Sequence, residues 1–261
     1  MRGRVAWSRP ASVRAGTLRN MQPTIKGTTL PVLEITLDQG ESVISTHGEL
    51  SWMSPNIVLS QTTGGGGGGG LLAGLKRAIG GGSFFQTQYQ CQGPGAGLVA
   101  FATKAPGQIL PVSINPGAGM LVHRHGFLCG TQGVTATAAP VAGLGAGLWG
   151  GEGFILQRLE GRGEAWIELS GEVTTYQLTP GQSMLVHPGH VGLFQESVGF
   201  QITRFKGVRN ILFGDNGFHL VALTGPGEIW LQSMPLPLLA HAIYPYLPQP
   251  RSEQGSQQRF F

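Results

Sequence analysis

Four histidines are the residues of this chain best suited to chemistry. His123 and His125 are separated by one residue, and a His-Pro-Gly-His stretch runs from His187 to His190. Alternate residues of a strand face the same side, so the imidazoles of the first pair would point in one direction. Imidazole binds zinc, iron, nickel or copper, and a site needs at least a third ligand. One hypothesis is therefore a metal site built from His123, His125 and either His187 or His190.

The surroundings of the first pair are similar to a metal motif of the cupins, which are double-stranded β-helix proteins. Gly117 is followed by five residues and then by His-x-His. The cupin pattern also expects a Glu soon after His125, but the next acid is Glu152, and the spacing before Pro188 departs from the second cupin motif. A cupin-like metal-binding protein is thus an alternative, and turn or surface histidines are the expectation. We assign no metal ligand and no cofactor.

The remaining polar side chains form no catalytic pattern. Cys91 and Cys129 are isolated and are expected to be buried thiols, as in a reducing compartment. No Gly-x-Ser-x-Gly nucleophile elbow occurs. Four acids recur at four-residue steps: Glu160, Glu164, Glu168 and Glu172. Gly161 and Gly163 would break a helix over this stretch, so the four acids are not expected to share one face. We expect a protein that is not an enzyme and has no catalytic residues.

A run of seven glycines at residues 64–70 does not match a phosphate-binding loop. Such a loop needs Gly-Lys-[Ser/Thr], but here Leu75 precedes Lys76 and Arg77 follows it. The run is therefore expected to be a flexible or closely packed loop. Residues 71–79 fit one or two helical turns that dock onto the protein itself, with peripheral membrane contact as the alternative.

The composition favours an all-β fold. The 261 residues include 44 Gly and 17 Pro, and only 11 % are charged, too few to solvate the outer faces of long helices. Residues 1–26 carry six basic side chains and no acid, while the rest has 11 basic and 13 acidic residues, a net charge of −2. A near-neutral body makes nucleic-acid binding unlikely. Core filling is the expected role of Trp52, Trp149, Trp166 and Trp230.

The two ends differ from the body. Residues 1–26 are interpreted as a disordered leader or as the product of a start codon placed too early. A cytoplasmic bacterial protein is then expected, or a mitochondrial one if residues 1–20 are a transit peptide. Residues 241–261 are expected to form a polar tail. No apolar stretch is long enough to predict a transmembrane segment.

Two units alternate three times along the chain. Unit B contains a glycine followed, three and four residues later, by two apolar residues, and it occupies residues 30–63, 104–135 and 173–204. Unit A contains a Gly-x-Gly turn between strand-like runs, which predicts a hairpin, and it occupies residues 74–103, 143–172 and 207–234. Repeats at this spacing are typical of stacked or radially arranged modules.

The repeats suggest a closed arrangement of a single domain at residues 27–240. If each unit A pairs with the unit B that follows, the first B and the last A remain and could pair with each other. Three modules would then close in a pseudo-threefold ring and leave no sheet edge exposed.

Several motifs resemble the family named for altered inheritance of mitochondria protein 24, in its bacterial and archaeal branch. They include Ser51-Trp52-Met53, the glycine run leading to Leu75-Lys76-Arg77, and Gly225-Pro226-Gly227, within a likeness from about residue 30 to 239. The resemblance implies double-stranded β-helix or jelly-roll modules like the tryptophan RNA-binding attenuation protein, repeated three times. It brings no catalytic residues, and the fungal member is tied to mitochondrial inner-membrane organisation.

We therefore expect a non-enzymatic β-scaffold or interaction protein. It is expected to form a homo-oligomer and to have a protein partner that the sequence does not name. Two alternatives stay open: the metal-binding protein described above, and a small-ligand or RNA binder by analogy with the attenuation protein. That analogy concerns the fold, which does not itself carry a function.

Overall fold

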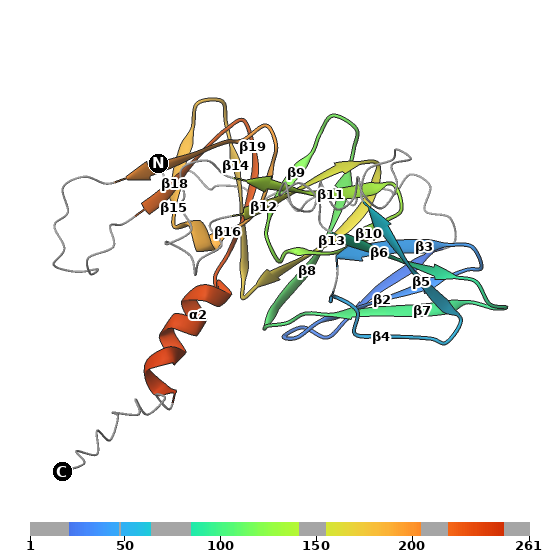
Figure 1. Cartoon of the computed structure of the whole chain (residues 1–261). Coiled ribbons are helices and arrows are strands. Elements are labelled where there is room, and N and C mark those ends of the chain that lie inside the picture. Colours follow the sequence, from blue (N-terminus) through green and yellow to red (C-terminus); the bar gives the residue numbers. More distant parts are fainter. Residues whose placement is uncertain (1–20, 47, 64–84, 141–154, 205–218, 248–261) are drawn as a thin grey trace, which may run out of the picture.

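The computed structural model describes residues 21–46, 48–63, 85–140, 155–204 and 219–247 (Figure 1). Within these ranges the chain forms nineteen strands, one α-helix and two short 3-10 helices, so the expected all-β class is confirmed. Several predictions lie outside the described residues: the leader at 1–20, the glycine run at 64–70, the helical turns at 71–79, Trp149 and the tail at 248–261.

The first repeat folds into six antiparallel strands, here called the first module. β6 lies between β3 and β5, and β7 lies between β2 and β4. Unit A thus supplies the middle strand of each half of the module. The bounds are β2 (Val32–Leu37), β3 (Ser42–Thr46), β4 (Trp52–Met53), β5 (Ile57–Thr63), β6 (Phe85–Cys91) and β7 (Gly97–Ala102).

The same pairing recurs in the second and third modules. β12 lies between β9 and β11, and β13 between β8 and β10; β18 lies between β15 and β17, and β19 between β14 and β16. The bounds of the second module are β8 (Gly107–Ile114), β9 (Met120–His123), β10 (Phe127–Thr131), β11 (Val134–Pro140), β12 (Ile155–Gly161) and β13 (Gly163–Ser170). Those of the third are β14 (Val173–Leu178), β15 (Ser183–Val186), β16 (Val191–Gln195), β17 (Gly199–Arg204), β18 (His219–Thr224) and β19 (Gly227–Gln232).

The strands assemble into four sheets. The first has the order β1-β2-β7-β4, the second β5-β6-β3-β10-β13-β8, the third β11-β12-β9-β16-β19-β14 and the fourth β15-β18-β17. The two strands of each unit A belong to neighbouring sheets, so the hairpin predicted at the Gly-x-Gly turns is wrong. These turns instead carry the chain from one sheet to the next.

Successive modules are joined by β3 with β10 and by β9 with β16. Among the described strands no ladder joins the third module to the first, and the two lie at opposite ends in Figure 1. Each unit A pairs with the unit B before it, so a module forms from one continuous stretch of the chain. The pseudo-threefold ring predicted from the sequence is therefore wrong, and the modules form an open row. The double-stranded β-helix or jelly-roll description stays a prediction.

One glycine per module has a left-handed backbone just before the second strand. The φ angles are 85° at Gly40, 77° at Gly117 and 77° at Gly181. Glycine adopts such angles without the steric penalty of a Cβ atom. The turn carries the chain from one sheet to its neighbour, which explains why these glycines recur in unit B.

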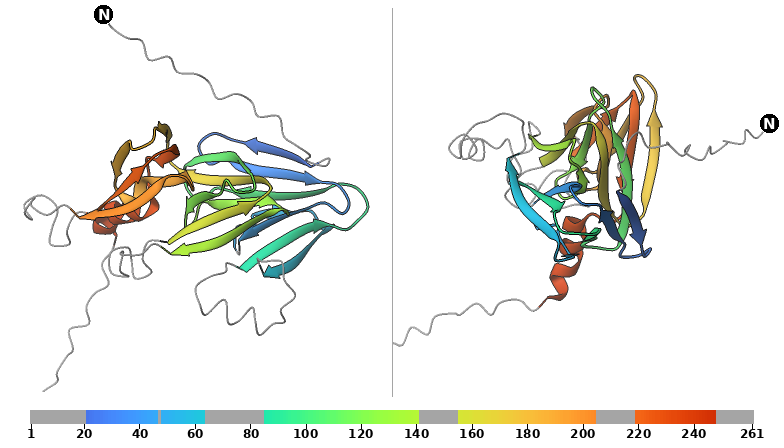
Figure 2. Two further views of the ribbon diagram at one scale, coloured as in Figure 1. Left: turned by 90° about the horizontal axis from the view of Figure 1, so that it is seen from above. Right: turned by 90° about the vertical axis from the view of Figure 1, so that its right-hand side faces the viewer.

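Three apolar clusters lie between consecutive sheets, so the molecule is a stack of four layers (Figure 2). One face of β2 is covered and the other is not, so its residues alternate between buried and partly buried. In the inner sheets, by contrast, all of β3 and residues 165–170 of β13 are buried. Both faces of these inner strands are covered, so their sequences lack the alternation typical of a half-buried strand.

The first strand corrects the expected leader boundary at residue 26. β1 (Gln22–Lys26) pairs with β2, and Lys26 Nζ lies 2.5 Å from Glu34 Oε2. At the other end, α2 (Leu236–Ile243) and η2 (Tyr244–Tyr246) follow β19 and cross the expected tail boundary. No helix in the described residues is long and apolar enough to cross a membrane.

The predicted roles of the cysteines and tryptophans are partly confirmed. Cys91 and Cys129 are buried free thiols. Trp166 is buried and Trp230 is packed against the second cluster. Trp52 is 46 % exposed, so the prediction that it fills the core is wrong in the isolated chain.

Candidate functional site

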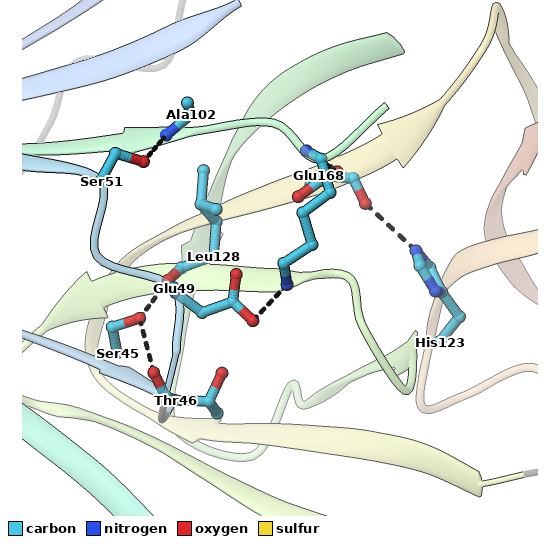
Figure 3. A network of polar contacts seen from close by, with 9 residues as sticks. Ser45, Thr46, Glu49, Ser51, Ala102, His123, Leu128 and Glu168 are labelled. Atoms are coloured by element: carbon cyan, nitrogen blue, oxygen red, sulfur yellow. Dashed lines mark hydrogen bonds and ion pairs between the residues drawn. The ribbon is translucent and has the colours of Figure 1, made fainter. Parts of the chain in front are cut away.

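A cluster of charged side chains lies where the first two modules meet (Figure 3). Glu49 follows β3, Lys104 lies in the connection from β7 to β8, and Glu168 is on β13. Lys104 Nζ is 2.5 Å from Glu49 Oε1, and the Lys104 backbone amide donates a 2.8 Å hydrogen bond to Glu168 Oε1. We call Glu49, Lys104 and Glu168 the junction cluster.

The junction cluster holds two buried carboxyl groups with a single ammonium group. Glu49 and Glu168 are both buried, and the Oε2 atom of each has no hydrogen-bond partner among the described residues. Burial raises the pKa of Glu168; the Lys104 amide and ammonium oppose this shift, and the Glu49 carboxylate adds to it. Two ionised carboxylates beside one ammonium group would leave a net negative charge at the junction, which acts in the same direction as the burial of Glu168.

His123, which also belongs to the second module, contacts the backbone of Glu168. It is the last residue of β9 and is partly buried, and its Nε2 lies 3.1 Å from the Glu168 backbone oxygen. A carbonyl only accepts, so Nε2 carries the proton. Burial lowers the pKa of His123 to about 4, although the hydrogen bond opposes this. The ring is therefore neutral at pH 7, and its Nε2 is occupied by a structural contact.

His125 does not share the setting of His123. Because β9 ends at His123, Arg124 and His125 lie in the following turn, and the predicted alternation on one strand is wrong. Burial lowers the pKa of His125, and the positive charges of Arg124 and Lys104 lower it further.

The other two histidines belong to the third module. His187 precedes η1 (Pro188–His190), and His190 is its last residue. The two ring centroids lie 5.8 Å apart in an edge-to-face arrangement. His190 Nδ1 is 2.8 Å from the Gln232 backbone oxygen. Burial lowers the pKa of His187. The described residues contain no group of three or more His, Cys, Asp or Glu side chains placed to hold a metal ion. The alternative metal site built from His123, His125 and His187 or His190 is therefore not formed.

The polar joint between modules occurs twice. Glu168 and Gln232 occupy the same place in their modules. Glu168 pairs with Ile109 in the ladder that starts at Gly163, and Gln232 pairs with Val173 at the same step of the ladder that starts at Gly227. Ser170 donates its backbone amide to Gln232 Oε1 at 3.0 Å, as Lys104 does to Glu168. In both joints a buried side-chain oxygen of one module accepts a hydrogen bond from the backbone of the preceding module.

Sequence reasoning missed the junction cluster. These three residues are distant along the chain, and in the sequence Glu168 stands out only as one of four acids at four-residue steps. The sequence does contain one indication of a buried acid. Glu168 lies in the run Ala-Trp-Ile-Glu-Leu, in which the four residues other than Glu168 are apolar. A charged residue in such a run is expected to have a buried partner.

Comparison with known proteins gives a family match, a relative in sequence and a similar solved structure. The model of the family described as mitochondrial biogenesis AIM24 matches residues 23–234. The chain is 28 % identical over 224 residues to an uncharacterized protein of Streptococcus pyogenes serotype M6, covering 84 % of this chain and 87 % of that protein. It is also similar to the crystal structure of another Streptococcus pyogenes protein, with a TM-score of 0.68 and 24 % identity over 87 % of this chain and all of that one. The latter likeness concerns the fold alone.

Proposed function

This chain belongs to the mitochondrial biogenesis AIM24 family, and from that premise we propose that it is a non-enzymatic β-scaffold that binds other proteins, including copies of itself. The observation that carries the proposal is that its polar side chains form hydrogen bonds within the fold. Glu168, Gln232 and His123 each contribute a hydrogen bond that ties one strand or module to another.

A catalytic site would use such groups differently. A general acid or base must reach the proton of a bound substrate. Glu168 is instead buried and His123 is partly buried, and both are engaged with backbone groups of other segments of the fold. The stack is thus arranged to hold its modules in a fixed row, which is what a scaffold requires.

The proposal extends to partner and location. The near-neutral body favours a protein partner over nucleic acid, because nucleic-acid surfaces carry clustered basic residues. Two buried free cysteines fit a reducing compartment and support the proposal of a cytoplasmic protein.

Native mass spectrometry of the full chain, purified without added metal or chelator, tests this proposal. It is expected to give a defined multimer with no additional bound mass. A strictly monomeric protein would overturn the self-association, and a stoichiometric metal or small molecule would favour the ligand-binding alternatives. RNA binding that weakens steeply with salt would favour the attenuation-protein analogy instead.

A further inference from the structure

Two strands at opposite ends of the row have an unpaired edge among the described strands. β4 is the last strand of the first sheet, and β15 is the first strand of the fourth. Both are apolar in sequence, Trp52-Met53 in β4 and Met184-Leu185-Val186 in most of β15. Exposed edges are normally protected by charge or proline, because open backbone groups invite pairing with another chain.

These two edges are the unused halves of the pairing that joins the modules. Inside the chain, the second strand of one module pairs with the third strand of the next, as β3 with β10 and β9 with β16. β15 is the second strand of the last module, and β4 is the third strand of the first module. A second copy of the chain would therefore offer β15 the strand that it lacks.

We propose that copies of this chain associate head to tail, with β15 of one copy pairing antiparallel with β4 of the next. The internal junctions fix the register. Ile44 lies opposite Gly130, and Leu121 lies opposite Phe194. The corresponding residues at the open ends are Leu185 and Met53.

The neighbouring pair follows from the same ladder. Val122 lies opposite Leu193 at the internal junction. Val186 and Trp52 hold these positions at the open ends, so they are opposite each other in the proposed pairing. Two apolar pairs therefore join the copies, Leu185 with Met53 and Val186 with Trp52.

Exposure at the ends fits a missing neighbour. Leu185 is 49 % exposed, whereas Ile44, at the same position of the first module, is 3 % exposed. Ile44 is covered because the third sheet packs on the second, as shown by the second cluster. Leu185 lies on the outer face of the fourth sheet, where the next copy would supply the next layer.

The tryptophans give a second, independent indication. Each module has one tryptophan in the same cross-strand pair: Trp52 with Ala100, Cys129 with Trp166, and Leu193 with Trp230. Trp166 packs against the first module, and Trp230 packs in the cluster shared with the second module. Trp52 has no preceding module in its own chain, so its exposed ring is suited to pack on the third sheet of another copy.

The side chains of the proposed pair face consistent directions. Val186 belongs to the cluster between the third and fourth sheets, and Trp52, opposite it, would point to the same side. Leu185 would face the second sheet of the incoming copy, together with Met53. This interface is heterologous, so it generates rings or filaments rather than a twofold dimer. The inference rests on the proposed scaffold function, since it names the partner as a second copy.

Cross-linking in the full chain tests the register directly. Met53→Cys and Leu185→Cys are made in separate proteins, mixed, and treated with a short bismaleimide. Cys91 and Cys129 are buried, which shields them from the reagent. The mixture is expected to give a cross-linked dimer, while neither protein alone does. Leu59→Cys is the matched control, because Leu59 is 44 % exposed on β5, which the proposal does not use. Equal cross-linking by the Leu59→Cys and Leu185→Cys mixture would overturn the register.

Charge substitution separates this inference from the broader proposal. Leu185→Lys is expected to abolish multimers in native mass spectrometry, whereas Leu59→Lys keeps them, with both variants folded by circular dichroism. If the Leu185→Lys variant remains multimeric, head-to-tail pairing is wrong while the scaffold proposal stands. If the unmodified chain is monomeric at every concentration, the head-to-tail pairing and the self-association in the proposed function are both overturned.

Discussion

The backbone amide of Lys104 donates a 2.8 Å hydrogen bond to the carboxyl group of Glu168 across the boundary between the first and second modules. Glu168→Gln keeps the accepting oxygen and removes the cost of burying a charge, so the free energy of unfolding should be unchanged or higher. Glu168→Ala leaves the amide without its acceptor and should lower that energy by about 1–3 kcal/mol. Urea unfolding measures both. Glu160→Ala, on the exposed end of β12, is the control and should change stability by less than about 0.5 kcal/mol.

Lys104 and Glu49 should be energetically coupled. The Glu49 carboxylate is buried, while the Lys104 side chain remains 41 % exposed. Solvent therefore screens the pair in part, and we expect a coupling of about 1 kcal/mol. A double-mutant cycle with Glu49→Gln and Lys104→Met measures it by urea unfolding. Additive effects of the two substitutions would show that the contact does not contribute.

Acid should destabilise the fold through His123. Its pKa is about 4 in the folded state and about 6.5 in the unfolded chain, so the unfolded state binds more protons between these values. The stability contributed by the neutral ring is present above pH 6.5 and is lost as the pH falls to 4, by about 3 kcal/mol. Burial raises the pKa of Glu168, which has the opposite effect on stability in acid.

Comparison of variants isolates the histidine contribution. His123→Gln should remove the part of the pH dependence that belongs to His123, because glutamine does not titrate. His241→Gln, on the exposed face of α2, is the matched control and should keep the pH profile of the unmodified chain. Identical profiles for the two variants between pH 4 and 6.5 would contradict the burial of a neutral ring.

Trp52 and Trp166, which belong to matching cross-strand pairs of the first and second modules, should respond differently to truncation. Trp166→Ala removes a ring buried in the first cluster and should cost about 3–5 kcal/mol of unfolding free energy. Trp52→Ala should cost less than about 1 kcal/mol, since truncation of an exposed ring leaves no cavity. It should nevertheless weaken self-association. Denaturant unfolding at low protein concentration and analytical ultracentrifugation separate the two effects.

Part of this fold could be predicted from the sequence because turns have strict local requirements. Gly40, Gly117 and Gly181 recur at the same place because a positive φ is needed there. The sequence could not predict whether a unit A pairs with the unit B before it or with the one after it. A unit A that lies between two B units can form strand pairs with either of them.

The junction cluster was beyond sequence reasoning for a similar reason. Glu49 and Lys104 are 55 positions apart, and nothing local indicates that they meet. The histidine pattern was visible but pointed to the wrong chemistry. His123 is held by the Glu168 carbonyl instead of a metal, because β9 ends there and the turn that follows places His125 elsewhere.

The most direct test of the scaffold account is native mass spectrometry of the full chain beside its Leu185→Lys variant. The account predicts multimers without bound ligand for the unmodified chain and a monomer for the variant. A monomeric unmodified chain that carries a stoichiometric metal or small molecule would contradict it.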